Sequence, residues 1–298
     1  MASSDLFVTS FTLQTNTIGV PLWETLKRYT KASPSLQKTP SQSGCVLIFA
    51  HGVGFHKEQW EPTINHLFKL DTQNTIREAW TNVVGYCVSP FTSILVLLLI
   101  TAEAIYDYTE ALVILRRDLL GDSNPEYSRK NRFILIGHSA GTVACVMALV
   151  FSNPPSNVMF DSLVLVETPI HHPSAEAHHT AMFKAFAVVN NCHDIWPSRE
   201  AARAWLAPLI VFQNHGLRPL PTAFYFDKTD GIILSVTWVD ENAAYSKDAK
   251  TSFTALWNLN TICGVVPIHL VCGARTILCH AKFRIQLLMP VKEGLLLL

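Results

Sequence analysis

A short glycine-flanked motif limits the folds open to this chain more than any other feature of its sequence. Gly137-His138-Ser139-Ala140-Gly141 directly follows the apolar run Phe133–Ile136 and precedes the small, apolar stretch Thr142–Phe151. In that setting the pattern is typical of a sharp turn between a buried strand and a helix, with the serine exposed on the turn. Amides at the start of such a helix face any negative charge that develops beside the serine. We therefore interpret Ser139 as a nucleophile, the alternative being a glycine-rich turn whose serine caps the helix.

A second motif lies earlier in the chain. Cys45–Ala50 is a continuous apolar run, typical of a strand buried on both faces, and it ends at His51-Gly52-Val53-Gly54. Small residues at a strand end let backbone amides approach an acyl oxygen, so we expect the amides of Val53 or Gly54, with that of Ala140, to form an oxyanion hole. Alternatively, the glycines only permit a tight turn and His51 satisfies a local hydrogen bond.

A serine nucleophile also requires a base, normally a histidine that a carboxylate orients, and in this arrangement the chain order is serine, acid, histidine. No histidine follows His280, and the stretch Gly273–His280 contains no Asp or Glu. His280 is therefore the only late candidate for the base. Glu167, directly after the apolar run Ser162–Val166, is the candidate acid, with a structural or surface glutamate as its alternative.

The remaining patterns predict an α/β chain, with a mainly parallel sheet covered by helices on both faces. Strands are expected at the apolar runs already named, at Ile268–Cys272 and, in antiparallel pairing, at Leu6–Leu13; helices are expected at Glu58–Leu70 and Ile105–Leu120. Between about residues 171 and 258 this alternation of strand and helix patterns stops. We interpret residues 1–298 as a single domain with a cap inserted there.

Composition narrows the class of ligand. Lys plus Arg and Asp plus Glu number 23 each, and no five-residue basic block is present, which excludes an electrostatic nucleic-acid footprint. A small acyl or ester substrate is the better expectation. The seven cysteines are scattered and indicate a reducing compartment without metal. The pairs His171-His172 and His178-His179 could suggest a metal site, but adjacent histidines point apart, so a polar cap surface is favoured. No metal or cofactor is expected.

One apolar segment leaves a membrane alternative open. Val83–Ala102 carries no charge and approaches the length of about 20 residues that a transmembrane helix needs. Gly85 and Pro90 dilute its first half, and no Lys or Arg cluster flanks it, which argues against insertion. The first residues of the chain also lack the basic and apolar pattern of a secretory signal.

These motifs resemble the α/β-hydrolase superfamily and, within it, the fungal hydrolases of host-selective toxin biosynthesis, of the AK-toxin and AF-toxin type. The resemblance rests on Phe49-Ala50-His51-Gly52, on the glycine-flanked serine motif, on Val166-Glu167-Thr168-Pro169 and on Asn214–Thr222, and it covers most of residues 1–80 and 105–273. It implies an α/β-hydrolase fold with an inserted cap. It also implies a peroxisomal hydrolase that acts on an ester or CoA-thioester intermediate in assembly of a polyene carboxylic acid.

Two segments depart from that family pattern. The apolar stretch Thr81–Ala104 interrupts it, and the tail 275–298 does not continue the expected acid, helix and histidine, nor does it end in a Ser-Lys-Leu-type peroxisomal address. The interruption resembles a translated intron or divergent sequence, and a frame change or gene decay would explain both departures. The alternative to an active hydrolase is therefore a catalytically impaired protein of the same fold with a binding role, or a decayed paralogue. The alternative location is the cytoplasm.

Overall fold

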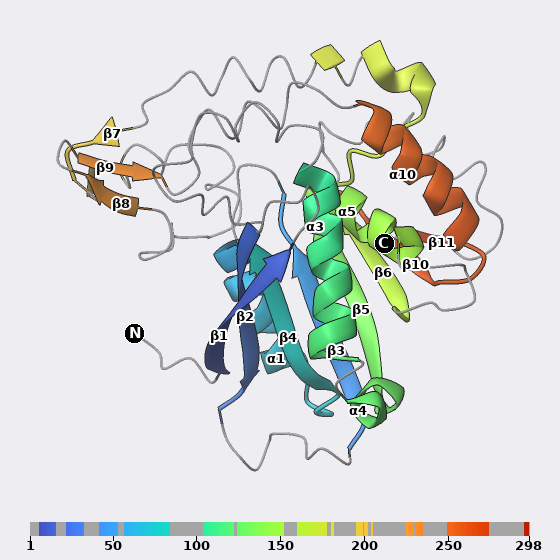
Figure 1. The fold of residues 1–298 in the computed structure, drawn as a ribbon, viewed down its shortest axis with the longest axis horizontal. Coiled ribbons are helices and arrows are strands. Elements are labelled where there is room, and N and C mark those ends of the chain that lie inside the picture. Colours follow the sequence, from blue (N-terminus) through green and yellow to red (C-terminus); the bar gives the residue numbers. More distant parts are fainter. Residues whose placement is uncertain are drawn as a thin grey trace.

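An eight-stranded sheet forms the centre of the computed structural model (Figure 1). The structure describes residues 6–15, 22–32, 42–52, 57–83, 104–121, 124–151, 160–177, 180–181, 195–198, 200–201, 204, 225–228, 231–234, 249–273 and 295–297. The strands are, in sheet order, β1 (Leu6–Thr15), β2 (Leu22–Lys31), β4 (Ile76–Val83), β3 (Gly44–Ala50), β5 (Asn131–His138), β6 (Ser162–Val166), β10 (Ile268–Val271) and β11 (Leu295–Leu297). The pairs β1–β2 and β2–β4 are antiparallel, and the other neighbours are parallel.

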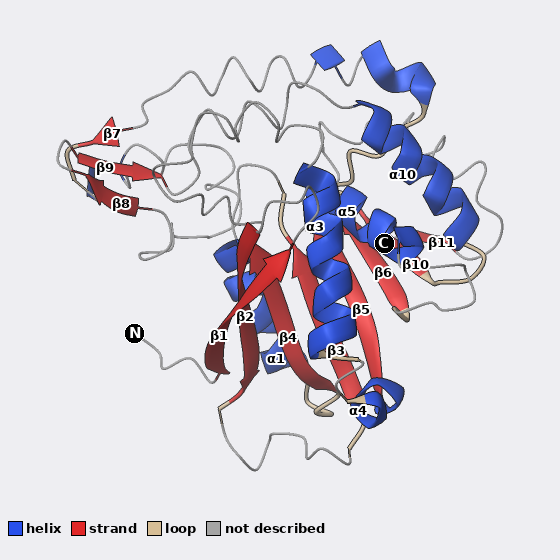
Figure 2. Ribbon diagram, in the orientation of Figure 1, coloured by secondary structure: helices blue, strands red, loops and turns tan. Residues whose placement is uncertain are grey.

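Helices cover both faces of this sheet, which confirms the predicted α/β architecture. On one face lies α1 (Glu61–Leu70), which follows a 3-10 turn at Lys57–Trp60. The other face carries α3 (Ala104–Ile114), α5 (Ala140–Phe151) and α10 (Ala249–Ile262). Figure 2 shows α3 in front of the sheet and α1 behind it. A π-helical turn at Leu115–Leu119 continues α3, and the short α4 (Pro125–Lys130) leads into β5.

The packing on both faces of strand β3 explains why every residue from Cys45 to Ala50 is apolar. Val46 and Ile48 belong to the core cluster that includes α3, α5 and α10. The alternate residues Leu47 and Phe49 belong to a second cluster, which contains Ile64 of α1. Because successive side chains of a strand point to opposite faces, a strand in the middle of a covered sheet must be apolar at every position.

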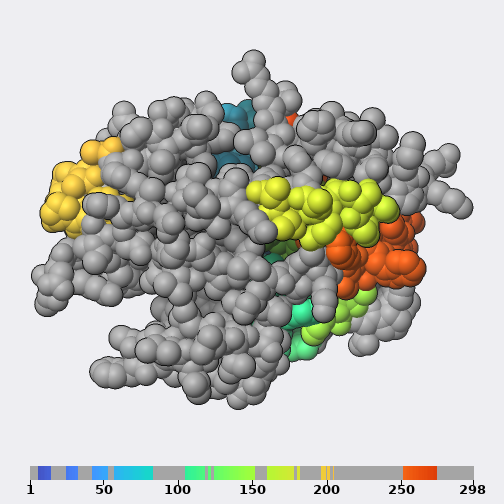
Figure 3. Space-filling view, turned by 90° about the horizontal axis from the view of Figure 1, so that it is seen from above, coloured from blue at the N-terminus to red at the C-terminus, as the bar shows by residue number. Residues whose placement is uncertain are grey.

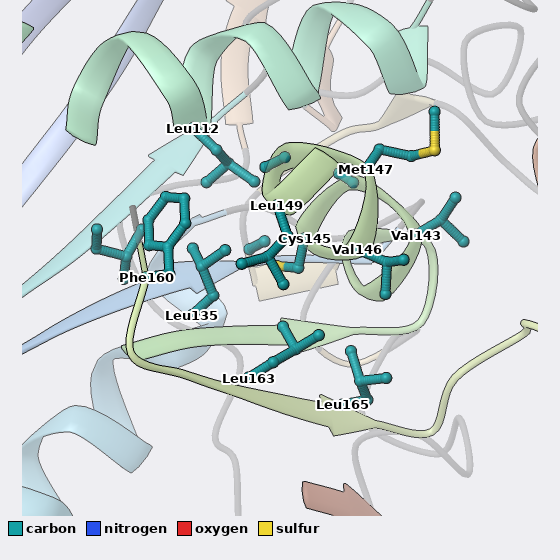
Figure 4. Close-up of a cluster of buried hydrophobic side chains, with 14 of the residues drawn as sticks. Leu112, Leu135, Val143, Cys145, Val146, Met147, Leu149, Phe160, Leu163 and Leu165 are labelled. Carbon is teal, nitrogen blue, oxygen red and sulfur yellow. The ribbon is translucent and has the colours of Figure 1, made fainter. Parts of the chain in front are cut away.

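Helix α5 lies in the largest core cluster, and its small side chains let it approach the sheet closely. Every residue from Gly141 to Leu149 is buried. Figure 4 shows Cys145 and Leu149 of this helix over Leu135 of β5 and Leu163 of β6. A helix that is apolar all round is the type that lies inside a protein.

Most predicted elements are confirmed, with shifts of a few residues at their ends. The run Phe133–Ile136 extends to Asn131–His138, whereas the last predicted strand ends at Val271, not Cys272. The helix predicted over Ile105–Leu120 consists of α3 and the π-helical turn. The early antiparallel strand is β1, which pairs with β2.

The sequence patterns did not predict β2 and β4, because charged residues interrupt their apolar positions. In β4, Glu78 is only 1% exposed. Its carboxylate accepts hydrogen bonds from Arg28 of β2, from the indole of Trp80 and from the hydroxyl of Tyr127. A buried carboxylate is tolerated when donors surround it in this way, but Arg28 and Tyr127 lie too far from it in sequence for a local pattern to reveal them.

The region expected to be an insertion contains a separate three-stranded sheet, of β7 (Ile195–Trp196), β9 (Gly231–Leu234) and β8 (Tyr225–Lys228). Figure 1 shows it at one end of the molecule, apart from the eight-stranded sheet. Helix α10 continues across residue 258, the expected end of the cap, because its Ala255, Leu256 and Leu259 pack into the main core.

Two other predicted segments lie largely outside the described residues. Val83 ends β4, and the rest of the apolar segment to Ala102 is not described. In the part of the chain that the structure describes, no helix is long and apolar enough to cross a membrane. In the tail 275–298 only Leu295–Leu297 is described, as the strand β11 beside β10.

Candidate active site

The two sequence motifs meet where the order of the sheet reverses. From β3 the chain continues to β4 on one side, whereas β5 lies on the other side of β3 and continues to β6. In open parallel sheets, ligands bind beyond the carboxyl ends of the strands at such a switch point. Ala50 at the end of β3 pairs with Gly137 of β5, so His51 and Gly52 emerge beside Ser139.

Ser139 occupies the expected sharp turn between β5 and α5. Its φ is 49°, in the left-handed region that costs a residue other than glycine roughly 1–3 kcal/mol. Its amide donates to the carbonyl oxygen of Val166 over 3.0 Å. Its own carbonyl accepts from the amide of Thr142 at 2.9 Å and from the Thr142 hydroxyl at 2.6 Å. Hydrogen bonds from two directions therefore hold the strained turn in place.

Gly52 brings the end of β3 into direct contact with this turn. A Cβ atom at Gly52 would lie 2.9 Å from the Cβ of Ser139 and 3.0 Å from Nδ1 of His138. The first separation is shorter than real Cβ contacts and the second is tighter than most, so only glycine fits here without a shift. Val53 and Gly54, the predicted oxyanion-hole residues that follow, lie outside the described residues.

Gly137 and Gly141, on either side of the serine, serve a related purpose. A Cβ at Gly141 would meet the carbonyl oxygens of Ala50 and His51 at 2.5 and 2.6 Å, and one at Gly137 would lie 2.7 Å from the carbonyl oxygen of Gly141. The glycines thus let α5 start against the end of β3. Ala140 is the first residue of α5, and first-turn amides have no acceptor within their own helix.

The two histidines of the motifs make local contacts. His51 is buried, its amide donates to the Tyr108 hydroxyl at 2.6 Å, and its Nδ1 donates to the carbonyl of Gly52 at 2.8 Å. The side-chain amide of Gln59 donates to Nδ1 of His138 over 3.4 Å. The sequence patterns did not indicate these contacts of Tyr108 and Gln59, because both residues lie within segments that were predicted only as helices.

Glu167 repeats the backbone geometry of Ser139 at the next strand of the sheet. Its φ is also 49°, and its amide donates to the carbonyl of Val271, the last residue of β10, at 2.9 Å. Its carboxylate accepts a hydrogen bond from the amide of Gly273. The candidate nucleophile and the candidate acid therefore stand at the carboxyl ends of adjacent strands. His280, the candidate base, lies outside the described residues.

The pair His171-His172 was expected at a polar surface, and this is wrong for His171, which is 5% exposed. Its Nδ1 donates to the carbonyl of Pro169 at 2.8 Å, and its Nε2 lies 2.9 Å from a carboxylate oxygen of Glu176. Both ring nitrogens are thus engaged within the same segment, which makes burial possible. His172 is exposed, so the two side chains do point apart.

The His171 ring also packs on Phe253 of α10, with ring centroids 5.4 Å apart. Figure 3 shows residues of this segment, in yellow-green, against the orange residues of α10. Among the residues that the structure describes, no group of three or more His, Cys, Asp or Glu side chains could hold a metal ion. His178 and His179 lie outside that part of the chain.

Several solved structures share this fold. The chain superposes on the peroxisomal alpha-beta-hydrolase Lpx1 of Saccharomyces cerevisiae with a TM-score of 0.70 and 15% identity, over 99% of this chain and 82% of that one. E-2-(acetamidomethylene)succinate hydrolase gives 0.61 and 17%, over 97% and 91%. The thioesterase domain from the curacin biosynthetic pathway gives 0.58 and 16%, over 97% and 92%.

At these identities the structural likeness establishes the fold alone. No curated protein sequence matches the chain. The model of the alpha/beta hydrolase family matches residues 47–274, which include both motifs, Glu167, most of β3 and the strands β4 to β10. This chain therefore belongs to the alpha/beta hydrolase family.

Proposed function

We propose that the chain is a serine hydrolase for an ester or an acyl thioester, with Ser139 as the nucleophile. The observation that carries the proposal is the strained turn at Ser139, at the switch point of the sheet, with Gly52 packed against it. A serine held on such a turn projects beyond the strand ends, where a substrate has access to it.

The proposed reaction has two steps. Ser139 Oγ attacks the carbonyl carbon while a base takes the hydroxyl proton, and the amides of Ala140 and of Val53 or Gly54 stabilise the oxyanion. The bond to the leaving oxygen or sulfur breaks, and the base returns its proton to the leaving alcohol or thiol. Water then attacks the acyl-enzyme by the same route and releases a carboxylic acid. Glu167 orients the base, for which His280 is the candidate.

For the biological setting we propose an acyl intermediate in fungal toxin biosynthesis, a polyene carboxylic acid ester or thioester. The support is the resemblance of the motifs around His51, Ser139 and Glu167 to those hydrolases. The structural neighbour Lpx1 is described as peroxisomal, which supports a peroxisomal location over the cytoplasm. A fluorescent fusion that coincides with a peroxisomal marker is the expected result, and uniform cytoplasmic fluorescence would contradict the location.

A fluorophosphonate probe tests the nucleophile directly, since covalent labelling requires both an exposed serine and a group that activates it. We expect the probe to label the purified protein and not to label the Ser139→Ala variant. Ser162→Ala is the matched control, because Ser162 lies at the start of β6, where its hydroxyl donates to the carbonyl of Pro267. Labelling that survives in Ser139→Ala, or disappears in Ser162→Ala, contradicts the assignment.

A second candidate function is binding without catalysis. It is favoured by the absence of any histidine after His280 in the sequence. Failure of the folded protein to react with the probe, together with a rise in melting temperature on addition of a non-hydrolysable acyl thioether, would favour this function. In the catalytic case, His280→Gln is expected to abolish labelling while the protein stays folded.

A further inference from the structure

We propose that Thr142 and Thr168 are positioning residues, which hold Ser139 and Glu167 in a fixed relation through a one-directional chain of hydrogen bonds. Neither residue carries chemistry itself. The inference rests on the proposed roles of Ser139 and Glu167. It adds that the threonine hydrogen bonds keep these two strained residues, which follow different strands, at a fixed position relative to each other.

The direction of each bond in the chain follows from the groups involved. The Thr142 hydroxyl donates to the carbonyl oxygen of Ser139 at 2.6 Å, because a carbonyl only accepts. Its oxygen lies 2.8 Å from that of Thr168, so the Thr168 hydroxyl supplies the proton for this contact. The oxygen of Thr168 in turn accepts from the amide of Ile170 at 3.2 Å. Each donor in this chain of hydrogen bonds therefore lies on the side of the loop after β6, and each acceptor lies on the side of the Ser139 backbone.

Burial makes the loss of these hydrogen bonds costly in free energy. Thr142 is 0% exposed and Thr168 is 2% exposed, so water does not compete for either hydroxyl. Removal of one hydroxyl would leave a buried partner unsatisfied, which costs more than the bond itself contributes. Threonine also has a stiff side chain, so the oxygen of each residue stays fixed relative to its backbone.

The chain of bonds joins the two strained positions. Thr168 directly follows Glu167, and Thr142 closes the turn that begins at Ser139. The direct bond from the Ser139 amide to the carbonyl of Val166 joins the ends of the same two strands. Without the hydroxyl chain, that bond and the pairing of β5 with β6 would remain, but the link from Thr168 to the Ser139 carbonyl would be lost. The Ser139 turn could then shift relative to Glu167. A nucleophile displaced by about 1 Å is known to lose as much as 100-fold in rate.

Thr142→Val and Thr168→Val test the proposal, since valine keeps the branched shape and removes only the hydroxyl. Relative to wild type, each variant should react with the fluorophosphonate probe about 10- to 100-fold more slowly. For a p-nitrophenyl ester, kcat should fall by the same factor while KM changes less than twofold. Thr142→Ser and Thr168→Ser retain the hydroxyl and should recover most of the rate.

Thr109→Val is the matched control. Thr109 is buried in α3, where its hydroxyl donates to the carbonyl of Ile105 at 2.7 Å. This variant loses one buried hydroxyl by the same substitution, and its labelling rate should stay within twofold of wild type. Slowing in all three valine variants, in proportion to their loss of melting temperature, would mean a general stability effect and would overturn the proposal.

The remaining outcomes separate the positioning role from the proposed function. Absence of labelling in wild-type protein refutes the nucleophile itself. Wild-type labelling rates in Thr142→Val and Thr168→Val refute the positioning role and leave the nucleophile standing. If Thr142→Val does not fold, Thr168→Val decides, because it leaves the bond between Thr142 and Ser139 in place; an unchanged rate in it overturns the proposal.

Discussion

Replacement of Gly141 by alanine should destabilise the fold, even though alanine is the better helix former. Gly141 is the second residue of α5, and a Cβ there would lie 2.5 Å from the carbonyl oxygen of Ala50 and 2.6 Å from that of His51. Both obstacles are backbone atoms at the end of a central strand, so a change of rotamer cannot relieve the clash.

The size of the effect follows from the required movement. Ordinary contact begins at 3.4 Å, so α5 and the end of β3 must separate by about 0.9 Å, and overpacking of this kind costs about 1–3 kcal/mol. The gain from helix propensity is at most about 1 kcal/mol and smaller in a first turn. We expect a net loss of about 2 kcal/mol, which lowers the melting temperature by roughly 4–8 °C.

Thermal unfolding followed by circular dichroism measures this loss. Gly264→Ala is the matched control, because an added Cβ at Gly264 would find no atom within 4 Å. That variant should be as stable as wild type or more stable by about 0.4–1 kcal/mol, since alanine restricts the unfolded chain. A Gly141→Ala protein that melts at or above the wild-type temperature would refute the packing argument, as would an equal loss in both variants.

Three further predictions concern the site, the pH dependence and the thiols. Gly52→Ala should slow labelling at Ser139 by about tenfold or more, since the added methyl meets the serine Cβ at 2.9 Å; an unchanged labelling rate would contradict it. Burial acts to raise the pKa of Asp71, but hydrogen bonds from Thr75 and Ile76 and the charge of Lys31 outweigh it and leave this pKa below its usual value. Because the folded-state pKa is depressed, this stabilisation is present above the unfolded pKa of about 3.9 and is lost as the pH falls through the folded value. Asp71→Asn should therefore lower the melting temperature at neutral pH, with a difference from wild type that narrows in acid; a difference that grows in acid would contradict the sign. Burial raises the pKa of the Cys145 thiol far above its usual range, so iodoacetamide should modify Cys145 only after unfolding, as peptide mass mapping would show.

The sequence predicted those parts of the fold that depend on residues close together in the chain. The apolar run at Cys45–Ala50 had to be a buried strand, and the small residues after Ser139 had to allow a close helix. Glu167 could be placed at a strand end because the run Ser162–Val166 stops immediately before it. In each case neighbouring residues carry the whole signal.

Contacts between distant residues escaped prediction because their partners come from separate elements. Two residues that bind the Glu78 carboxylate are distant in sequence: Arg28 lies 50 residues away and Tyr127 lies 49 residues away. Thr142 and Thr168 likewise have no pattern that links them before β5 and β6 pair. Such partners become visible only when the sheet order is known.

Because His171 packs on Phe253, the segment between these two residues should tolerate changes in its length. These two rings lie 5.4 Å apart, so the residues on either side of this region lie next to each other. The entropy of closing a loop grows only with the logarithm of its length, about 0.6 kcal/mol for each doubling. Segments of very different length could therefore connect these two points at a small entropic cost to the sheet. On the proposed function, selectivity for the acyl chain could then be exchanged while the serine turn stays intact.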